Sequence, residues 1–392
     1  MTGRRGQLTR QPAHQSSPIV DIPDPDPDNN VVGIAIAKLQ EILVSVYQSL
    51  ENKEVLRVPY KTRPGSRRSR RNPPSAARAT RSRSAPSVLQ FPGRTENESI
   101  KFTQVLKIIH LSHSSLLSGN PVTKRNLFYQ CPDLFKTQAI IDGLVDDISY
   151  TLGIGRDDLN IVASAKGLLA GPIILHMRDL SSISASASDT GVTIPTTRNI
   201  SRIDFQHAEW VLDTSSAGQG ILITGKGVPD LQTKQFLHLL HSAKPELPIY
   251  GLVDFDPYGV NIMRCYSHGS RGHAHEVGVT VPSMQWLGIK SGDLVGRQDL
   301  EDDDAHAEVL DLTVFRRQQS ESNFEATDVL KERDRKIAKT LLRNIPDDLD
   351  EYNIQCRREL QIMLFLNVKA EIQAVDDAGD ISNWLDAHIR RV

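Results

Sequence analysis

The sequence predicts an α/β protein with two folded domains, and three observations favour this class. The chain has 392 residues, more than one compact core usually holds. Its first half has three helical segments followed by two short apolar strands. Its second half alternates apolar strands with amphipathic helices, which is typical of a parallel sheet covered on both faces.

The composition excludes several classes of protein. Hydrophobic residues make up 39% and charged residues 24% of the chain, so wholesale disorder and collagen-like repetition are excluded. The three cysteines lie far apart, which predicts no disulfide framework and fits a reducing compartment. No apolar run approaches the ~20 residues of a membrane span, and the N-terminus lacks the apolar core of a secretory signal. We therefore expect no membrane partner.

The N-terminal part is predicted as three segments. Residues 1–30 are rich in proline and polar residues and are predicted to be a disordered tail. Residues 31–60 carry apolar residues at spacings of three and four and are predicted to form an N-terminal helix. Residues 61–97 are predicted to be a basic Arg/Ser/Pro linker of low complexity.

The linker concentrates positive charge. Residues 61–95 hold ten basic side chains and no acid, and the other 36 basic and 48 acidic residues give the rest of the chain a net charge of −12. A solvated linker or a nuclear-import signal is the simpler interpretation. The alternative is a tether that binds DNA through phosphates without reading its sequence.

Residues 98–177 are predicted to form a winged-helix domain. Helical patterns at 100–117 and 136–152 flank a short segment, KRNLFYQCPDLF. Two apolar strands around a Lys166-Gly167 turn follow. Three helical segments and a hairpin have the order of a winged helix, a DNA-docking variant of the helix-turn-helix.

Residues 178–392 are predicted to form an α/β domain with C-terminal helices. GILITGKG, PIYGLVDFDPYG and HEVGVTVPSMQWLG contain strands, and LQTKQFLHLLHSA and VNIMRCYSHGS read as helices. Two long helices are expected at roughly 325–343 and 355–375.

Asp254 and Asp256 follow the apolar strand IYGLV. Residues i and i+2 of an extended chain point to the same side, so both carboxylates can meet one Mg²⁺ at the carboxyl end of a strand. A solvated turn is the alternative, because the residues of DFDPYG are good turn formers.

Other polar residues carry weaker signals. A tyrosine phenol such as Tyr129 can attack a phosphodiester, and Arg125 would share its helix face, although a core or stacking aromatic is an alternative. Lys226 in the turn TGKG could contact a phosphate or belong to a structural turn. His268, His273 and His275 are interpreted as solvated loop residues rather than a metal cluster, and the acidic run 299–304 as a solvated insertion.

The ordered motifs KRNLFYQCPDLF, SAKGLLAG, ILITGKGVPDLQT, GLVDFDPYGVNIM and VPSMQWLG closely resemble the A subunit of type IIB DNA topoisomerases, the topoisomerase VI class. More narrowly, they resemble the meiotic branch, whose members make the double-strand breaks that start recombination. The resemblance covers roughly residues 98–375. It implies a topoisomerase–primase (Toprim) fold for the second domain and a nuclear, chromosome-associated location.

The resemblance implies roles for individual residues. Tyr129 matches the nucleophile of the family and Arg125 its arginine, while Asn126 replaces an acid. Asp254 and Asp256 match the Mg²⁺-binding pair. Three lysines in the motifs KRNLFY, SAKG and TGKG are expected to contact DNA: Lys124, Lys166 and Lys226.

The implied partners are double-stranded DNA, a second family member in a homodimer or heterodimer, meiotic accessory proteins and a B-type subunit. The implied reaction is transesterification, in which Tyr129 of one protomer works with the acids of another to leave a 5′-phosphotyrosyl bond.

One departure leaves alternatives open. Family members carry a V-E-K glutamate before the TGKG turn, but here Asp213-Thr214-Ser215-Ser216 follows Leu212 and no V-E-K exists. Asp213 could replace it. The alternatives to an active enzyme of this family are a DNA-binding partner subunit without a working metal site and a primase-like or metal-dependent nuclease, which would not need Tyr129.

Overall fold

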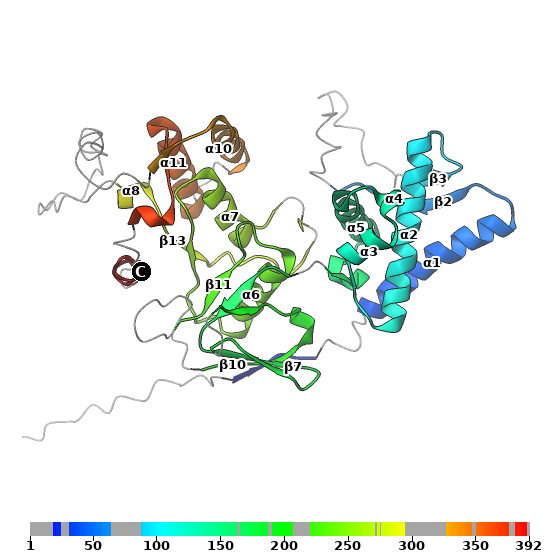
Figure 1. The fold of residues 1–392 in the computed structure, drawn as a ribbon, viewed down its shortest axis with the longest axis horizontal. Helices are drawn as coiled ribbons and strands as arrows, with labels where there is room; N and C mark the ends of the chain where they lie inside the picture. The colour runs from blue at the N-terminus through cyan, green and yellow to red at the C-terminus, as the bar shows by residue number, and fades with distance from the viewer. Residues whose placement is uncertain are drawn as a thin grey trace, which may run out of the picture.

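The computed structural model describes residues 19–24, 31–63, 88–162, 165–186, 190–206, 220–270, 273–274, 276–294, 327–346, 350–375 and 381–389. These residues form two bodies that lie side by side (Figure 1). The first body holds residues 31–162, and the second holds the described residues from 165 onwards together with 19–24. Both helices and strands are present, so the predicted α/β class is confirmed.

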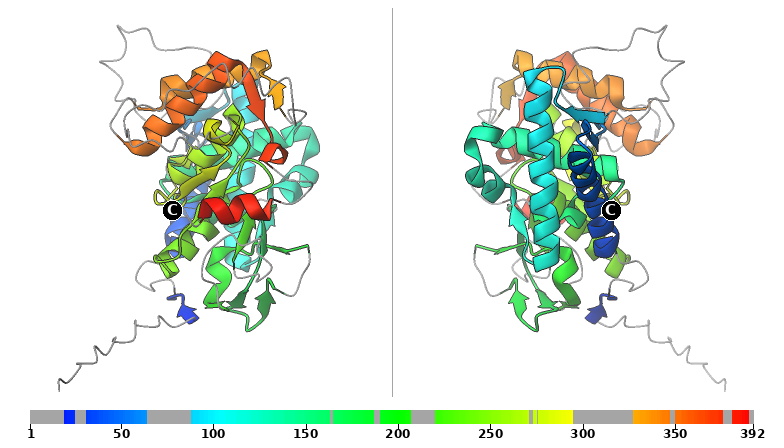
Figure 2. Two further views of the ribbon diagram at one scale, coloured as in Figure 1. Left: turned by 90° about the vertical axis from the view of Figure 1, so that its left-hand side faces the viewer. Right: turned by 90° about the vertical axis from the view of Figure 1, so that its right-hand side faces the viewer.

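The first body is mainly helical. Its long helices are α1 (Val31–Glu51), α2 (Glu96–Ser118) and α5 (Gln138–Leu152). Helix α2 begins where the Thr95 side chain accepts a hydrogen bond from the Glu98 N–H and ends at Gly119, whose φ of 70° suits glycine. Helices α1 and α2 run beside one another (Figure 2). Their buried apolar stripes and that of α5 form one hydrophobic core.

Short elements complete the first body: β2 (Leu56–Pro59), β3 (Val88–Phe91), β4 (Val122–Thr123), α3 (Lys124–Gln130), α4 (Pro132–Phe135), η2 (Arg156–Leu159) and β5 (Ile161–Val162). Strands β2 and β3 pair antiparallel, and β4 and β5 pair parallel. The predicted helix over 31–60 therefore ends early, and residues 88–91 of the predicted linker form a strand. Four-residue strands that pair with distant partners leave too short a pattern to be recognised in the sequence.

Two antiparallel sheets form one side of the second body. They have the strand orders β1-β10-β7-β8 and β11-β6-β9. Their strands are β1 (Ile19–Asp21), β6 (Leu168–Ala170), β7 (Ile173–Met177), β8 (Ser182–Ser184), β9 (Val192–Thr193), β10 (Ile200–Phe205) and β11 (Leu222–Thr224), with η3 (Thr197–Asn199) before β10. Buried side chains of β7 and β10 pack with Phe236 and Leu240 of helix α6 (Leu231–Ala243).

A parallel strand pair and C-terminal helices form the other side. The elements are β12 (Tyr250–Leu252), α7 (Pro257–Ser267), β13 (Gln285–Gly288), α8 (Ser291–Leu294), β14 (Thr327–Val329), α10 (Glu332–Asn344), α11 (Glu351–Leu366), β15 (Val368–Ala370), η6 (Ile372–Val375) and α12 (Ser382–Ile389). Strands β12 and β13 are parallel and β14 and β15 antiparallel. The predicted parallel sheet is thus seen as the β12–β13 pair. The predicted C-terminal helices are present as α10 and α11, but each predicted range includes a short strand.

The hairpin predicted around Lys166 and Gly167 is wrong. Strand β5 pairs with β4, β6 pairs with β9 and β11, and β7 pairs with β8 and β10. The apolar runs were recognised as strands, but no local pattern indicates partners so far away along the chain. The predicted helical segments are present as α2, α3 and α5, whereas the hairpin predicted to follow them is not seen in the described part of the first body. The predicted domain boundary at residue 177 stays a prediction, although β6 and β7 join sheets of the second body.

Residues 19–21 correct the predicted disordered tail. They form strand β1, whose Ile19 and Asp21 pair with Asp204 and Arg202 of β10. Arg202 also donates a hydrogen bond of 2.5 Å to the Asp21 carboxylate. Three residues are too few to show periodicity in the sequence. Four predicted segments lie wholly or partly outside the described residues. They are residues 1–18 and 25–30 of the tail, residues 64–87 of the basic linker, Leu212–Ser216 and the acidic run 299–304.

Helix α1 satisfies the length and composition of a membrane-spanning helix, unlike any other helix that the structure describes. In the structure, however, Ala35, Leu39, Ile42 and Val46 are buried in the core of the first body. A core helix of a water-soluble protein passes the same test, so this helix is weak evidence for a membrane.

Candidate functional site

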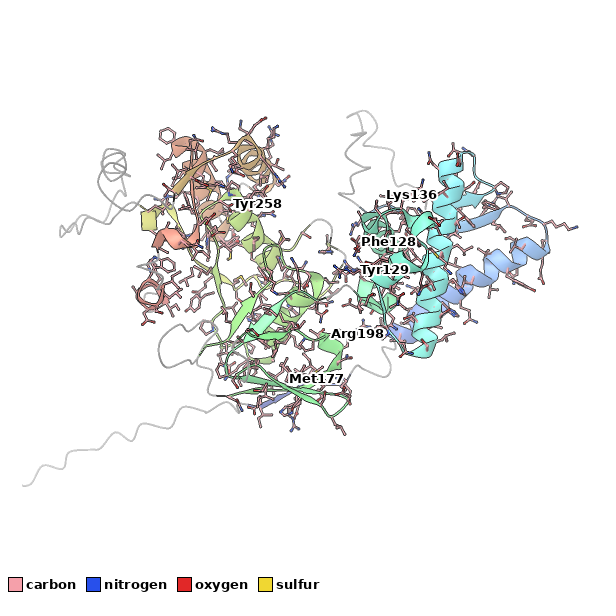
Figure 3. All side chains as sticks on the ribbon, viewed as in Figure 1. Phe128, Tyr129, Lys136, Met177, Arg198 and Tyr258 are labelled. Carbon is pink, nitrogen blue, oxygen red and sulfur yellow. The ribbon has the colours of Figure 1, made fainter. Side chains whose placement is uncertain are left out.

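Tyr129 lies on the short helix α3 and is 73% exposed. The Thr123 hydroxyl accepts a hydrogen bond of 3.1 Å from the Asn126 N–H and so caps the start of this helix. Leu127 is fully buried and fixes the opposite face. The Phe128 ring meets Tyr129 edge-on, with 5.6 Å between ring centroids. The helix therefore presents the phenol to solvent on a capped and packed turn (Figure 3).

Arg125 is also exposed and precedes Tyr129 by four residues. Side chains at this spacing lie on one face of a helix. The structure thus brings together the two residues predicted to attack and to stabilise charge. A guanidinium on the same helix face as the phenol can attract the phosphate that the phenol would attack.

Lys124 is buried, unlike the exposed Arg125 and Tyr129 of the same helix. It is 4% exposed, and its ammonium lies 2.9 Å from the Asp142 carboxylate and 3.9 Å from that of Asp146. Burial lowers its pKa, followed by the positive charge of Arg156. This is the placement of an internal ion pair, and it does not favour the predicted contact of Lys124 with DNA.

Asp254 and Asp256 follow β12 in the second body, as the sequence predicts. Phe255 between them exchanges backbone hydrogen bonds of 2.9 and 3.0 Å with Ala370 of β15. Asp254 Oδ1 accepts a 2.9 Å hydrogen bond from the Ile372 N–H. Asp256 caps α7 and accepts one from the Gly259 N–H at 2.5 Å. Strand β15, the start of η6 and the start of α7 therefore hold the acid pair in place.

Gly259 is required for this turn. A Cβ atom at this position would lie 2.2 Å from the carbonyl oxygen of Asp254, a distance that real contacts do not allow. The motif DFDPYG is therefore a tight turn as well as a pair of acids. The turn that the sequence predicts is present, with both acids half-buried, and their binding of Mg²⁺ stays a prediction.

Burial raises the pKa of Asp256, and the negative charges of Asp254 and Asp334 act in the same direction. The Gly259 hydrogen bond and the positive charge of Lys369 oppose this rise. The ammonium of Lys369 lies 3.7 Å from the carboxylate of the buried Asp334. Neither Asp334 nor Lys369 was predicted near the acid pair, because each lies far along the chain in an ordinary charged context.

The acid pair has donors that suit Mg²⁺. Each carboxylate uses one oxygen for a backbone N–H, which leaves a second hard oxygen from each for a cation. Mg²⁺ is commonly bound by one or two carboxylates and keeps several waters. Asp254 and Asp256 therefore fit a partly hydrated Mg²⁺. Among the residues that the structure describes, no third His, Cys, Asp or Glu joins them as a ligand group.

Lys166 and Lys226 come together from two loops of the second body. The Lys166 ammonium donates a 2.6 Å hydrogen bond to the Val228 carbonyl oxygen. It also lies 3.5 Å from the backbone carbonyl oxygen of Lys226. The Lys166 N–H binds Asp230 at 2.9 Å. Lys226 is exposed at the tip of the TGKG turn with a φ of 50°. The turn is thus a structural element that also presents a cation to solvent.

The two described histidines of this group, His268 and His273, make separate contacts. His268 stacks on Tyr352, with 5.0 Å between ring centroids. His273 lies with its Nδ1 3.0 Å from the ammonium of the buried Lys234. Burial, followed by the charge of Lys234, lowers the pKa of His273 to about 3. His273 is therefore a partly buried contact rather than a solvated residue, and His275 lies outside the described residues.

Tyr129 and the acid pair belong to different bodies. Figure 3 shows Tyr129 at the edge of the first body and Tyr258, two residues after Asp256, in the upper part of the second. The described chain thus carries Tyr129 and the acid pair on different bodies and does not join them into one site.

Comparison with known proteins matches both bodies. Residues 100–161 match the family "Type IIB DNA topoisomerase", and residues 212–386 match the Toprim domain of the family that unites Spo11 with the A subunit of topoisomerase 6. The meiotic recombination protein rec12 of Schizosaccharomyces pombe is 32% identical over 299 residues, covering 74% of this chain and 76% of the relative.

Two further relatives are matched over about half of their length. The meiotic recombination protein SPO11 of mouse is 31% identical over 210 residues, which is 50% of this chain and 53% of the relative. The A subunit of DNA topoisomerase 6 from Arabidopsis thaliana is 32% identical over 211 residues, which is 50% of this chain and 49% of the relative.

Proposed function

This chain belongs to the family of Spo11 and the topoisomerase 6 A subunits, and from that membership we propose that it is a topoisomerase-like DNA transesterase that makes meiotic double-strand breaks. The observation that carries the proposal is the exposed phenol of Tyr129 beside Arg125 on a capped helix within residues 100–161. The similarity to rec12 and SPO11, both meiotic recombination proteins, supports the biological role and a nuclear, chromosome-associated location.

The chemistry is a phosphoryl transfer in which atoms and charge balance. The Tyr129 phenol loses its proton, and its oxygen attacks the phosphorus of a DNA phosphodiester. The bond from phosphorus to the 3′ oxygen breaks, and that oxygen takes up a proton to become a 3′-hydroxyl. The protein is then joined to the 5′ end through a phosphotyrosyl bond. One ester replaces another, so cleavage needs no ATP.

The residues of this chain have separate tasks in that reaction. Arg125 stabilises the negative charge on the phenolate and on the phosphate. Asp254 and Asp256 would hold Mg²⁺, which neutralises charge on the phosphate when bound. Lys166 and Lys226, both exposed, would contact DNA phosphates farther from the cut.

The separation of Tyr129 from the acid pair supports a site made by two chains. We propose that Tyr129 of one protomer works with the acids of a second family member, so that two chains cut two strands. Double-stranded DNA, meiotic accessory proteins and a B-type subunit complete the proposed assembly. The winged-helix and Toprim folds are the proposed fine structure of the two bodies.

The alternative of a DNA-binding subunit without catalysis is less well supported. It depends on the missing V-E-K strand at Leu212–Ser216. Both acids are present and are held in place by backbone hydrogen bonds, which supports a working metal site in this chain. A metal-dependent nuclease is the other alternative, and it would not depend on Tyr129.

Replacing Tyr129→Phe tests the proposal, because this change removes one oxygen from an exposed side chain. Covalent protein–DNA adducts that survive denaturant should disappear, while the free energy of unfolding changes by less than about 0.5 kcal/mol. Tyr47→Phe is the matched control, since Tyr47 is 61% exposed on α1. Adducts that persist in Tyr129→Phe would exclude the proposed nucleophile, and DNA cleavage without adducts would favour the nuclease.

A further inference from the structure

A buried ionic cluster lies beneath the helix that carries Tyr129. Asp146 of α5 is 5% exposed and meets cations from three segments of the chain. Its carboxylate contacts the Arg63 guanidinium, lies 3.1 Å from that of Arg156 and 3.9 Å from the ammonium of Lys124. Removing one member of such a cluster leaves a buried charge without compensation, which is strongly destabilising. The cluster therefore holds its members in one arrangement.

The cluster anchors α3 directly. This helix has seven residues, too few to be stable alone, and its two buried side chains are Lys124 and Leu127. Lys124 is its first residue, and its ammonium also binds Asp142 of α5 at 2.9 Å. One of the two buried side chains of α3 is therefore held by ion pairs.

Arg156 extends the same cluster to the second body. Arg156 is 8% exposed and begins η2. Its guanidinium holds Asp146, while its backbone N–H donates a 3.1 Å hydrogen bond to Glu276 of the second body. In the same turn, Asp158 forms an ion pair with Arg198, also of the second body.

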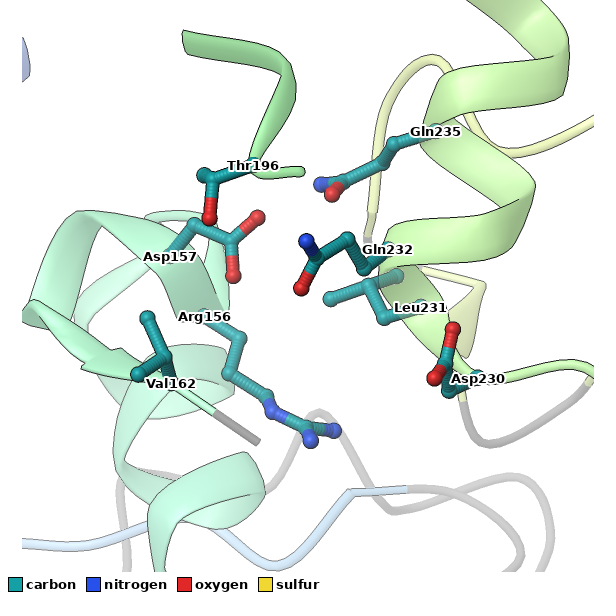
Figure 4. Close-up of a pocket in the computed structure, with 8 residues that line it drawn as sticks. All are labelled: Arg156, Asp157, Val162, Thr196, Asp230, Leu231, Gln232 and Gln235. Atoms are coloured by element: carbon teal, nitrogen blue, oxygen red, sulfur yellow. The ribbon is translucent and has the colours of Figure 1, made fainter. Parts of the chain in front are cut away.

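A small pocket lies where the two bodies meet. Figure 4 shows Arg156 and Asp157 facing Gln232 and Gln235 of α6 across it. The turn η2 therefore touches both the cluster beneath α3 and the polar groups of the second body.

We propose that Arg156 is a positioning residue, which couples the placement of the second body to the orientation of α3 and hence of Tyr129. This inference rests on the proposed function in one respect, the role of Tyr129 as nucleophile. Movement of the second body shifts η2 through Glu276 and Arg198. The Arg156 side chain then shifts Asp146, which holds Lys124 at the start of α3.

The first test is amide hydrogen exchange in the full chain. Arg156→Met keeps much of the side-chain length but removes the charge, and it should speed exchange of the α3 amides by about tenfold or more by local opening. Arg156→Lys should give a smaller effect. Arg202→Met is the matched control, because Arg202 of β10 forms an ion pair with Asp21, away from the cluster, and α3 exchange should not change.

Adduct formation gives the second readout. A displaced nucleophile can cost about 10²-fold in rate, so we expect Arg156→Met to lower adduct formation by that order while the dissociation constant for DNA changes less than about threefold. A general loss of structure would instead weaken DNA binding as well. If Arg156→Met does not fold, Asp146→Asn, which keeps the side-chain volume, takes its place with the same expectation.

Two results would overturn the inference. One is unchanged α3 exchange in a folded Arg156→Met or Asp146→Asn protein. The other is unchanged α3 exchange in Glu276→Ala, in which η2 loses its partner in the second body. The proposed function fails independently: if Tyr129→Phe still forms adducts while α3 exchange responds to Arg156 and Glu276, the coupling stands and the nucleophile is another residue.

Discussion

The N–H of Ile372 lies 2.9 Å from Asp254 Oδ1 and donates a hydrogen bond to it. Together with the paired backbone of Phe255 and Ala370, this contact makes strand β15 and the start of η6 part of the acid site. The strand also brings the Lys369 ammonium close to Asp334 and Asp256. The acid pair is therefore supported by a segment that lies far from it in the sequence.

Arg125→Ala should suppress adduct formation by about 10²-fold, the usual effect of losing one donor that stabilises developing charge. Arg125 is exposed, so the free energy of unfolding should change by less than about 0.5 kcal/mol. The rate of adduct formation and a denaturant titration measure the two effects. Arg57→Ala, an exposed arginine on β2 of the same body, is the control. If the two substitutions have equal effects, Arg125 contributes only a general attraction to DNA and does not stabilise charge in the reaction.

Inserting a family-like strand with V-E-K after Leu212 should strengthen Mg²⁺ binding. Two carboxylates give Mg²⁺ few protein ligands, and a third would add both an oxygen and a charge. A magnesium titration of both chains measures the change, with Asp254→Ala as the control that weakens binding in each. If the unchanged chain already binds Mg²⁺ as tightly as the extended one, then Asp213 or another acid provides the third ligand, and the alternative of an inactive subunit loses its main support.

Replacing residues 64–87 by a Gly/Ser linker of equal length should weaken DNA binding equally for all sequences. This segment avoids β3 and also Arg63, whose guanidinium contacts Asp146, and it contains seven of the ten basic residues of 61–95. Each phosphate contact contributes a slope of about −0.9 to the salt dependence of binding to duplex DNA. The slope of log affinity against log salt should therefore become less negative. An unchanged slope would leave the linker and nuclear-import interpretations.

His273→Gln should make the protein less sensitive to acid. The folded protein holds the pKa of His273 at about 3, below its ordinary value of 6.5. The unfolded chain therefore binds a proton that the folded chain does not, and stability is lost as the pH falls below 6.5. The loss amounts to roughly 1–2 kcal/mol between about pH 7 and pH 5. Denaturant unfolding at both pH values measures it, and an equal loss in His273→Gln would contradict the assignment.

Sequence patterns predicted the features that depend on neighbours in the chain. The periodicity of α1, α2 and α5, the exposed pair Arg125 and Tyr129, and the turn of Asp254 and Asp256 are local, and each is present in the structure. The assignment of the nucleophile and metal roles to these residues still depends on the experiments above.

Features that depend on distant partners were missed. Lys124 has the same neighbours in the sequence as Arg125, yet it is buried and its ammonium pairs with two carboxylates of α5. Asp334 and Lys369 meet near Asp256 only because β14, α10 and β15 pack against one another. Short strands such as β1 and β3 take their stability from partners far along the chain, and three or four residues hold no periodic signal.

Strand β1 has a consequence for how the protein can be shortened. It covers the outer side of β10 in the second body, although the residues that follow it, from Val31, belong to the first. A protein that began at α1 would leave the side of β10 that pairs with β1, at Arg202–Asp204, without its partner strand. Exposed edges of this kind pair with other chains, so such a fragment should self-associate through β10 even though it keeps the fully buried apolar residues of both bodies.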